Sequence, residues 1–299
     1  LVEIDDYAFY GLSSVPTITI PSTVTTIGVN PFVWMSSLEQ IVVASGNKTF
    51  TVQQGALYNR KTNVLIAFPR KYVTSSFAFR EGVVEIGEHA FANVSAKLII
   101  TFPDSIRTIR DDAFYSCKNM IFTNFPVAIE YLGAMAFSSS GLESATIPGT
   151  IKTFDRSCFN SAALKTIEIC PGVSEIPLGA FVGCDGLTEV TIPETVVNIG
   201  NFAFRSCSNL KSVNIPASVT SIGENVFEND TQLTVKVAKG RLVRPTASKI
   251  ISLISIMNLI LQLLQLFGNT RCLMALLLLH LIQQSIISSP LEWRLVIRQ

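Results

Sequence analysis

Cysteine and histidine are the residues of this sequence whose side chains could most readily carry out chemistry. The 299-residue chain has cysteines at positions 117, 158, 170, 184, 207 and 272, and its two histidines are His89 and His280. A nucleophile needs a base close by, and a structural zinc site needs four ligands at short spacings. No C-x-x-C pair occurs, and no histidine lies near Cys184 or Cys207. We therefore expect no metal, no cofactor and no nucleophilic centre.

The positions of these residues instead indicate structural roles. Cys117, Cys184 and Cys207 each follow a phenylalanine by three residues, where cysteine behaves as a small buried hydrophobic residue. A disulfide between Cys184 and Cys207 is an alternative, although stacked neighbours rarely offer the required dihedral angle. His89 directly precedes Ala90-Phe91, and we expect it on an exposed turn without a catalytic role.

Acidic pairs are the other candidates for catalysis. Asp5-Asp6 and Asp111-Asp112 both stand shortly before an Ala/Phe pair, so their recurrence indicates solvated turn residues rather than an acid and a base. The sequence has no phosphate-binding glycine-rich loop, no H-E-x-x-H and no nucleophile elbow. The net charge of +1 gives no electrostatic basis for binding nucleic acid. These observations predict a protein that is not an enzyme.

A period of 22 or 23 residues organises most of the chain. The stretch from Asn198 to Phe227 contains Ile-Gly-x-x-x-Phe twice, and a proline, Pro216, stands between the copies. Such a period is typical of stacked-repeat proteins. The same spacing joins two series of residues, the phenylalanines at 91, 114, 137, 159, 181, 204 and 227 and the prolines at 103, 126, 148, 171, 193 and 216.

Each repeat begins with a pattern typical of a β-strand. Val213 and Ile215 alternate with polar residues, and Pro216 then ends the strand because proline has no N–H for a ladder. We expect Gly223 to permit a backbone bend and Phe227 to point into the core. Stacked repeats would bury each other's apolar side chains and join their strands in one long parallel sheet. The predicted fold is an α/β-type leucine-rich-repeat solenoid of 22–23-residue rungs over residues 1–237.

The repeats resemble a known family. The phrase I-P-x-S-V-x-x-I-G-x-x-x-F-x-x-C is similar to the BspA-like leucine-rich repeats of bacterial and protozoan surface proteins, clearest at 102–117, 190–207 and 213–227. The resemblance covers about residues 1–237. It implies a surface antigen that functions in adhesion or partner binding.

One interval breaks the period. Phe32 and Phe91 are 59 residues apart, and residues 47–69 contain short apolar runs around polar turns such as N-R-K-T-N. BspA-like proteins are similar in carrying islands of the form N-x-x-F-T-V-x-x-G-A-L-Y-N. We expect a β-hairpin insertion at about 44–76, either as an extra structural rung or as a dedicated ligand loop.

The outward strand positions offer a candidate partner-binding face. These positions lie two residues before each proline, and we include Glu168 although its repeat has one extra residue. Short polar side chains are also what any soluble strand face needs. The candidate residues are Thr19, Thr101, Asn124, Thr146, Glu168, Thr191 and Asn214.

Three N-x-S/T sequons mark candidate glycosylation sites at Asn47, Asn93 and Asn229.

The end of the chain differs in composition. Residues 238–249 form a basic linker, and the hydrophobic tail 250–299 has no charged residue from Ile250 to Thr270. Membrane association through 250–291, an amphipathic helix with its polar residues at 255, 258, 262 and 265, and an out-of-frame segment all remain open. The predicted fold includes this tail as helical.

These features lead to two functional hypotheses. The favoured one is a non-catalytic cell-surface or secreted protein that binds a protein of a host cell, matrix or neighbouring cell. The alternative is a cytoplasmic scaffold that binds a signalling partner through the same face. Because Leu1 already lies inside a repeat, we expect the chain to be a fragment or to start at a doubtful gene boundary.

Overall fold

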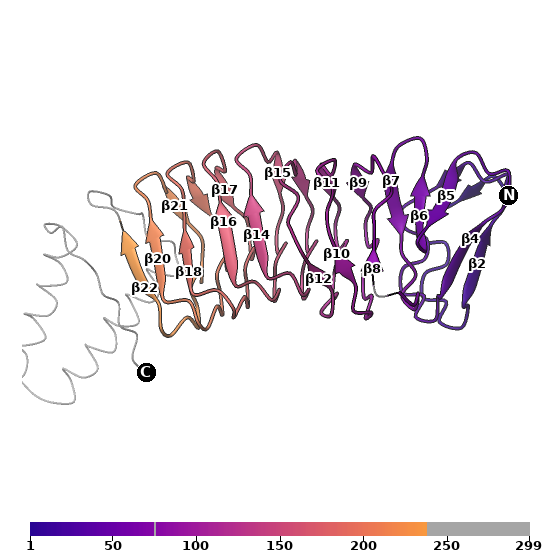
Figure 1. The fold of residues 1–299 in the computed structure, drawn as a ribbon. Coiled ribbons are helices and arrows are strands. Elements are labelled where there is room, and N and C mark those ends of the chain that lie inside the picture. The colour runs from indigo at the N-terminus through magenta and orange to yellow at the C-terminus, as the bar shows by residue number, and fades with distance from the viewer. Residues whose placement is uncertain (75, 238–299) are drawn as a thin grey trace, which may run out of the picture.

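The computed structural model describes residues 1–74 and 76–237, which form an elongated stack of rungs (Figure 1). Most rungs contain two short strands with a turn between them, and each row of strands runs along the stack. The row before the turn, here called the pre-proline strands, comprises β2 (Thr17–Ile20), β4 (Gln40–Val43), β8 (Ser76–Phe77), β10 (Ile99–Ile100), β12 (Ile121–Phe122), β14 (Ser144–Ile147), β16 (Thr166–Ile169), β18 (Glu189–Thr191), β20 (Ser212–Ile215) and β22 (Thr234–Val237).

A second row of strands follows the turn and was not predicted from the sequence. Each of these post-proline strands has only two residues, and they pair in parallel from rung to rung, as Ile199 with Ile222. They are β1 (Glu3–Ile4), β3 (Thr26–Ile27), β9 (Glu85–Ile86), β11 (Thr108–Ile109), β13 (Tyr131–Leu132), β15 (Thr153–Phe154), β17 (Glu175–Ile176), β19 (Asn198–Ile199) and β21 (Ser221–Ile222).

The prediction of one long parallel sheet is wrong. The pre-proline strands form four separate sheets, β2-β4, β8-β10-β12, β14-β16 and β18-β20-β22. The first break coincides with the insertion. The other two lie beside the two rungs that carry one extra residue before their proline, Phe125 before Pro126 and Cys170 before Pro171. An extra residue displaces the backbone from the ladder, which interrupts the hydrogen bonding to the next rung.

The residues around each phenylalanine form turns, and no helix occurs in residues 1–74 and 76–237. The helical component of an α/β-type fold is therefore not found there. Phe202 and Ser206 have φ values of 59° and 60°, and residues with positive φ recur at the equivalent places in other rungs. A left-handed residue every four positions prevents a right-handed helix. Instead, alternate N–H groups donate within the rung, as Ala203 to Gly200, and to the next rung, as Phe204 to Val226.

The structure gives a different reason for the recurrence of glycine at this place in the repeat from the one predicted. A Cβ on Gly200 would lie 2.6 Å from the backbone nitrogen of Leu178, and a Cβ on Gly87 would lie 2.9 Å from the carbonyl oxygen of Leu65. Glycine thus permits close approach between rungs at these positions, rather than a bend within one rung.

The phenylalanine column is confirmed. Phe181 and Phe204 are fully buried, their ring centroids are 5.2 Å apart, and their planes differ by 12°. Phe227 continues the column at 5.8 Å from Phe204. Removing such rings from water contributes roughly 1.5–3 kcal/mol each to folding. The column begins again after the insertion at Phe68, which stacks on Phe91 at 5.1 Å.

The insertion contains three antiparallel strands rather than one hairpin. They are β5 (Phe50–Gln53), β6 (Ala56–Asn59) and β7 (Val64–Ala67). β7 also pairs in parallel with β9, through Leu65 and Ile86, so it serves as the post-proline strand of a rung. Phe68 follows it and lies 23 residues before Phe91, which restores the period.

Residues 1–74 and 76–237 contain no helix long and apolar enough to cross a membrane. The predicted basic linker at 238–249 and the predicted helical, membrane-associated or mistranslated tail at 250–299 lie outside the described residues.

Candidate partner-binding face

Five of the seven candidate face residues occupy the expected outward positions of pre-proline strands. Thr146 on β14 pairs in register with Glu168 on β16, and its hydroxyl donates to Glu168 Oε2 at 3.3 Å. Thr191 pairs with Asn214 between β18 and β20. Thr19 on β2 pairs with Val42, which the sequence pattern had not included. The strands thus place these side chains in a row, interrupted only where the sheets break.

The sixth and seventh residues, Thr101 and Asn124, are not equivalent. The partner of Thr101 is Thr123, whose Oγ1 lies 2.7 Å from Thr101 Oγ1. Asn124 instead uses its side-chain amide to bridge the neighbouring backbone, because its Oδ1 accepts from Phe102 N–H at 2.7 Å and its Nδ2 donates to Phe102 O at 2.8 Å. Counting back from Pro126 failed here because this rung has one extra residue before its proline.

An apolar pair lies beside Thr101 and Thr123. Ile99 and Ile121 are direct partners in the ladder, and they are 46% and 42% exposed. Most other outward positions in this row carry polar side chains, such as Ser144 and Thr166. Sequence reasoning missed this pair, although Ile99 stands four residues before Pro103, at a strand position where outward residues are expected.

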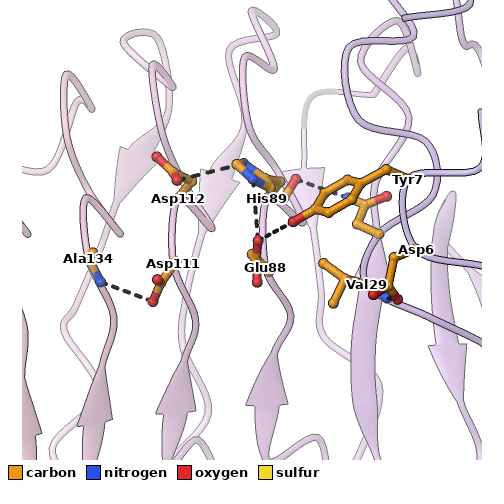
Figure 2. A network of polar contacts seen from close by, with 9 residues as sticks. Asp6, Tyr7, Val29, Glu88, His89, Asp111, Asp112 and Ala134 are labelled. Atoms are coloured by element: carbon orange, nitrogen blue, oxygen red, sulfur yellow. Dashed lines mark hydrogen bonds and ion pairs between the residues drawn. The ribbon is translucent and has the colours of Figure 1, made fainter. Parts of the chain in front are cut away.

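A polar network lies on the turn side, where the first rungs meet the body of the stack (Figure 2). Tyr7 Oη donates to Glu88 Oε1 at 2.5 Å, and Asn30 Nδ2 donates to His89 O at 3.1 Å. His89 lies between two carboxylates, 3.5 Å from Glu88 Oε1 and 3.9 Å from Asp112 Oδ2. Its side chain is 22% exposed, so His89 is on a turn as expected but is more enclosed than predicted.

The electrostatics of this network are those of a structural contact. The hydrogen bond to Glu88 and burial raise the pKa of Tyr7 to about 12, so its hydroxyl remains a donor at neutral pH. Burial raises the pKa of Asp112, and His89 opposes that rise. Among residues 1–74 and 76–237 no group of three or more metal-binding side chains is arranged to hold an ion.

The acidic pairs have a role that the sequence pattern did not indicate. The Oδ1 atom of Asp6 accepts from Val29 N–H at 2.7 Å, and that of Asp111 accepts from Ala134 N–H at 3.1 Å (Figure 2). Asn201 binds Glu224 N–H in the same way at 2.8 Å. These side chains therefore hydrogen-bond the next rung and are not merely solvated.

Cys117, Cys184 and Cys207 are buried, as the repeat pattern predicted. Cys117, Cys158, Cys184 and Cys207 are buried free thiols, and Cys170 is partly exposed. Burial raises the pKa of Cys207 to about 12, which leaves the thiol protonated and unreactive. No disulfide joins Cys184 to Cys207, and Cys272 lies outside the described residues.

The three sequon asparagines have different environments. Asn47 is 7% exposed, and its Nδ2 donates to Pro21 O at 2.9 Å and to Val24 O at 3.0 Å. A glycan on that nitrogen would break both bonds and would have no room, so this fold does not accommodate glycosylation of Asn47. Asn93 is half-buried, and Asn229 is exposed. Glycosylation at these two positions stays a prediction.

The sequence matches the family described as BspA type leucine rich repeat region, in six copies over residues 1–74, 66–187 and 157–242. The chain belongs to this family. The BspA-type repeat accounts for the features that most rungs share, namely the pre-proline strand, the proline turn and the buried phenylalanine. The family is defined by its repeat and indicates no catalytic function.

Two solved structures that are similar to this chain are of bacterial proteins, and the first of them has the same fold. A leucine-rich repeat protein from Eubacterium ventriosum is 24% identical over 83% of this BspA-type chain and 66% of its own, with a TM-score of 0.58. A leucine rich cell surface protein from Faecalibacterium prausnitzii is 25% identical over 81% of this chain and 52% of its own, with a TM-score of 0.41. The BspA-type chain therefore spans less than two thirds of either protein. No curated protein sequence matches it.

Proposed function

We propose that this BspA-type protein is a non-catalytic cell-surface protein that functions in adhesion. It binds a protein of a host cell, matrix or neighbouring cell through the outward side chains of its pre-proline strands, here called the pre-proline face. The observation that carries this proposal is the exposed pair Ile99 and Ile121, in register within a row of short polar side chains. Protein interfaces combine an apolar centre with a polar rim.

The surrounding residues supply that rim. Thr101 and Thr123 lie next to the pair, and Thr146, Glu168, Thr191 and Asn214 extend the row towards β20. Their side chains project from strands that each pair with at least one neighbouring rung, so little entropy is lost when a partner orders them. A rigid, repetitive face of this kind suits a broad protein surface.

Site-specific photocross-linking tests the proposal. A photoreactive side chain at Thr123 should cross-link the full chain to intact cells or to a protein from a panel of purified matrix proteins. The matched control is the same side chain at Val84, which is 38% exposed and adjoins a post-proline strand. Cross-links of equal yield from Thr123 and Val84, or from Val84 alone, would contradict binding through the pre-proline face.

The proposed surface location rests on the resemblance to BspA-like surface proteins. Labelling of intact cells with a membrane-impermeant reagent should modify exposed lysines such as Lys152 and Lys165, whose side chains are 74% and 63% exposed. Labelling that appears only after lysis would favour the intracellular scaffold. The buried free thiols fit either compartment, because burial protects them from oxidation.

A further inference from the structure

A groove of about 370 Å³ lies beside β4, where the insertion interrupts the pre-proline row. Among the described strands, β4 pairs with β2 alone, and the next strand of the row, β8, pairs with β10. The hydrogen-bonded ladder of pre-proline strands is therefore interrupted between β4 and β8. The groove is lined by residues of β4 and of the insertion, among them Gln40, Val42, Ser45, Thr51, Val52 and Arg60.

On the edge of β4 that faces this groove, the backbone groups pair with no strand among residues 1–74 and 76–237. Gln40 N–H donates to Pro16 O, directly before β2, at 3.0 Å, and Ala44 N–H donates to Ile20 O of β2 at 2.9 Å. Successive residues of a strand direct their N–H and C=O groups to opposite edges. The groups of Ile41 and Val43 consequently point to the edge away from β2. Such an edge is a template for another strand.

The opposite wall adds a second strand and one charge. β5 is the terminal strand of its sheet, and its residues Thr51 and Val52 line the groove. Among the described residues that line the groove, Arg60 is the only charged one, and its Nε donates to Phe50 O at 2.9 Å. This bond fixes the guanidinium plane while its two terminal nitrogens make no hydrogen bond to residues 1–74 or 76–237, so they can bind a carboxylate.

We propose that this groove binds an extended segment of a protein partner, which adds to β4 as a parallel or antiparallel strand and places an acidic side chain against Arg60. The volume is within the range of ligand sites, and main-chain bonds would provide affinity while Arg60 provides selectivity. The inference rests on the proposed function in taking a protein as the ligand, but it assigns a different surface from the pre-proline face.

Selection of a random nonapeptide library displayed on phage, with the immobilised full-length protein, tests the proposal. Enriched peptides should alternate apolar and polar residues and contain an aspartate or glutamate. Synthetic copies should bind about tenfold or more weakly to Arg60→Gln, since hydrogen bonds to a charged group have this effect. Lys61→Gln, an exposed residue of the same turn outside the groove, is the control and should bind as the wild type does.

A proline pair tests the strand addition itself. Val43→Pro removes an N–H that points into the groove, so it should abolish peptide binding with little change in melting temperature. Val42→Pro removes an N–H directed at β2 and should lower the melting temperature. If Val43→Pro unfolds the protein, the comparison of Arg60→Gln with the wild type decides the question alone.

Three results would overturn the proposal: no enriched peptide, equal binding to Arg60→Gln and to the wild type, or a dimer that Val43→Pro disrupts. Ile99→Lys should leave peptide binding intact, which separates this site from the pre-proline face.

Discussion

The thiol of Cys207 donates a hydrogen bond to the carbonyl oxygen of Phe181, 3.1 Å away on the preceding rung. Cys184 binds Phe159 in the same way at 3.0 Å, and Cys117 binds Phe91 at 3.0 Å. Each of these cysteines thus connects two rungs through a hydrogen bond. A disulfide between Cys184 and Cys207 would remove both donors, which is a reason for the thiols to remain free.

Buried thiols should be protected from alkylation. Iodoacetamide at pH 8 should modify Cys170 before any other described cysteine, because Cys170 is partly exposed and the others are buried. Burial also raises the pKa of Cys117 to about 12, so little thiolate is present. Mass mapping of the alkylated sites with time checks this order. Alkylation of Cys207 as fast as that of Cys170 would contradict it.

Truncation of one ring in the phenylalanine column should strongly destabilise the fold. Phe204→Ala should cost about 3–5 kcal/mol, because a fully buried ring between two stacked neighbours is replaced by a cavity. The control is Phe202→Asn, since Phe202 has a positive φ that asparagine tolerates better. Thermal unfolding should show a large loss for Phe204→Ala and no loss for Phe202→Asn.

The inter-rung bond of Asp111 should be measurable. Asp111→Ala should lower the free energy of unfolding by about 1 kcal/mol, because Ala134 N–H loses its acceptor. Asp111→Asn keeps an oxygen at the same place and should be close to the wild type. Denaturant titration compares the three proteins, and equal losses for both variants would show that the negative charge rather than the hydrogen bond matters.

The carboxyl group of Asp230 should make stability depend on pH. Asp230 stands three residues after Phe227, where three other rungs have cysteine, and both of its carboxyl oxygens are buried. Burial raises its pKa from 3.8 to about 7. Between these values the folded state holds a proton that the unfolded state has lost, so stability should fall as pH rises from about 4 to 7.

Asp230→Asn provides the test of that pH dependence. The variant should lose the fall in stability and should exceed the wild type at pH 8 by about 1–2 kcal/mol, since no charge is then buried. Urea unfolding midpoints at pH 5 and pH 8 give the comparison. A wild type that becomes more stable between pH 5 and pH 8, relative to the variant, would contradict the argument.

The sequence predicted the features that every rung repeats. The spacing of Phe181, Phe204 and Phe227 predicted a stacked column, and the alternation around Val213 predicted a strand with one buried face. These predictions succeeded because the same core positions carry apolar side chains in most rungs, so the repeat leaves a clear pattern.

Features that depend on the backbone were not predicted. The two-residue strands such as β19 are too short to show alternation, and the left-handed residues vary in type from Ser206 to Phe202. The extra residue before Pro126 moved Asn124 out of the row, because counting from prolines assumes that every rung has the same length. The groove beside β4 arises from strand pairing and leaves no pattern in the sequence.

The most direct test of the proposed function is the affinity of the full chain for the partner identified by cross-linking. The double variant Ile99→Lys/Ile121→Lys introduces charge at two exposed positions and should weaken binding at least tenfold without changing the melting temperature. The control Val197→Lys alters a residue that is equally exposed, at 46%, beside a post-proline strand. We predict wild-type affinity for this control. Unchanged affinity in the double variant, or an equal loss in Val197→Lys, would contradict binding through the pre-proline face.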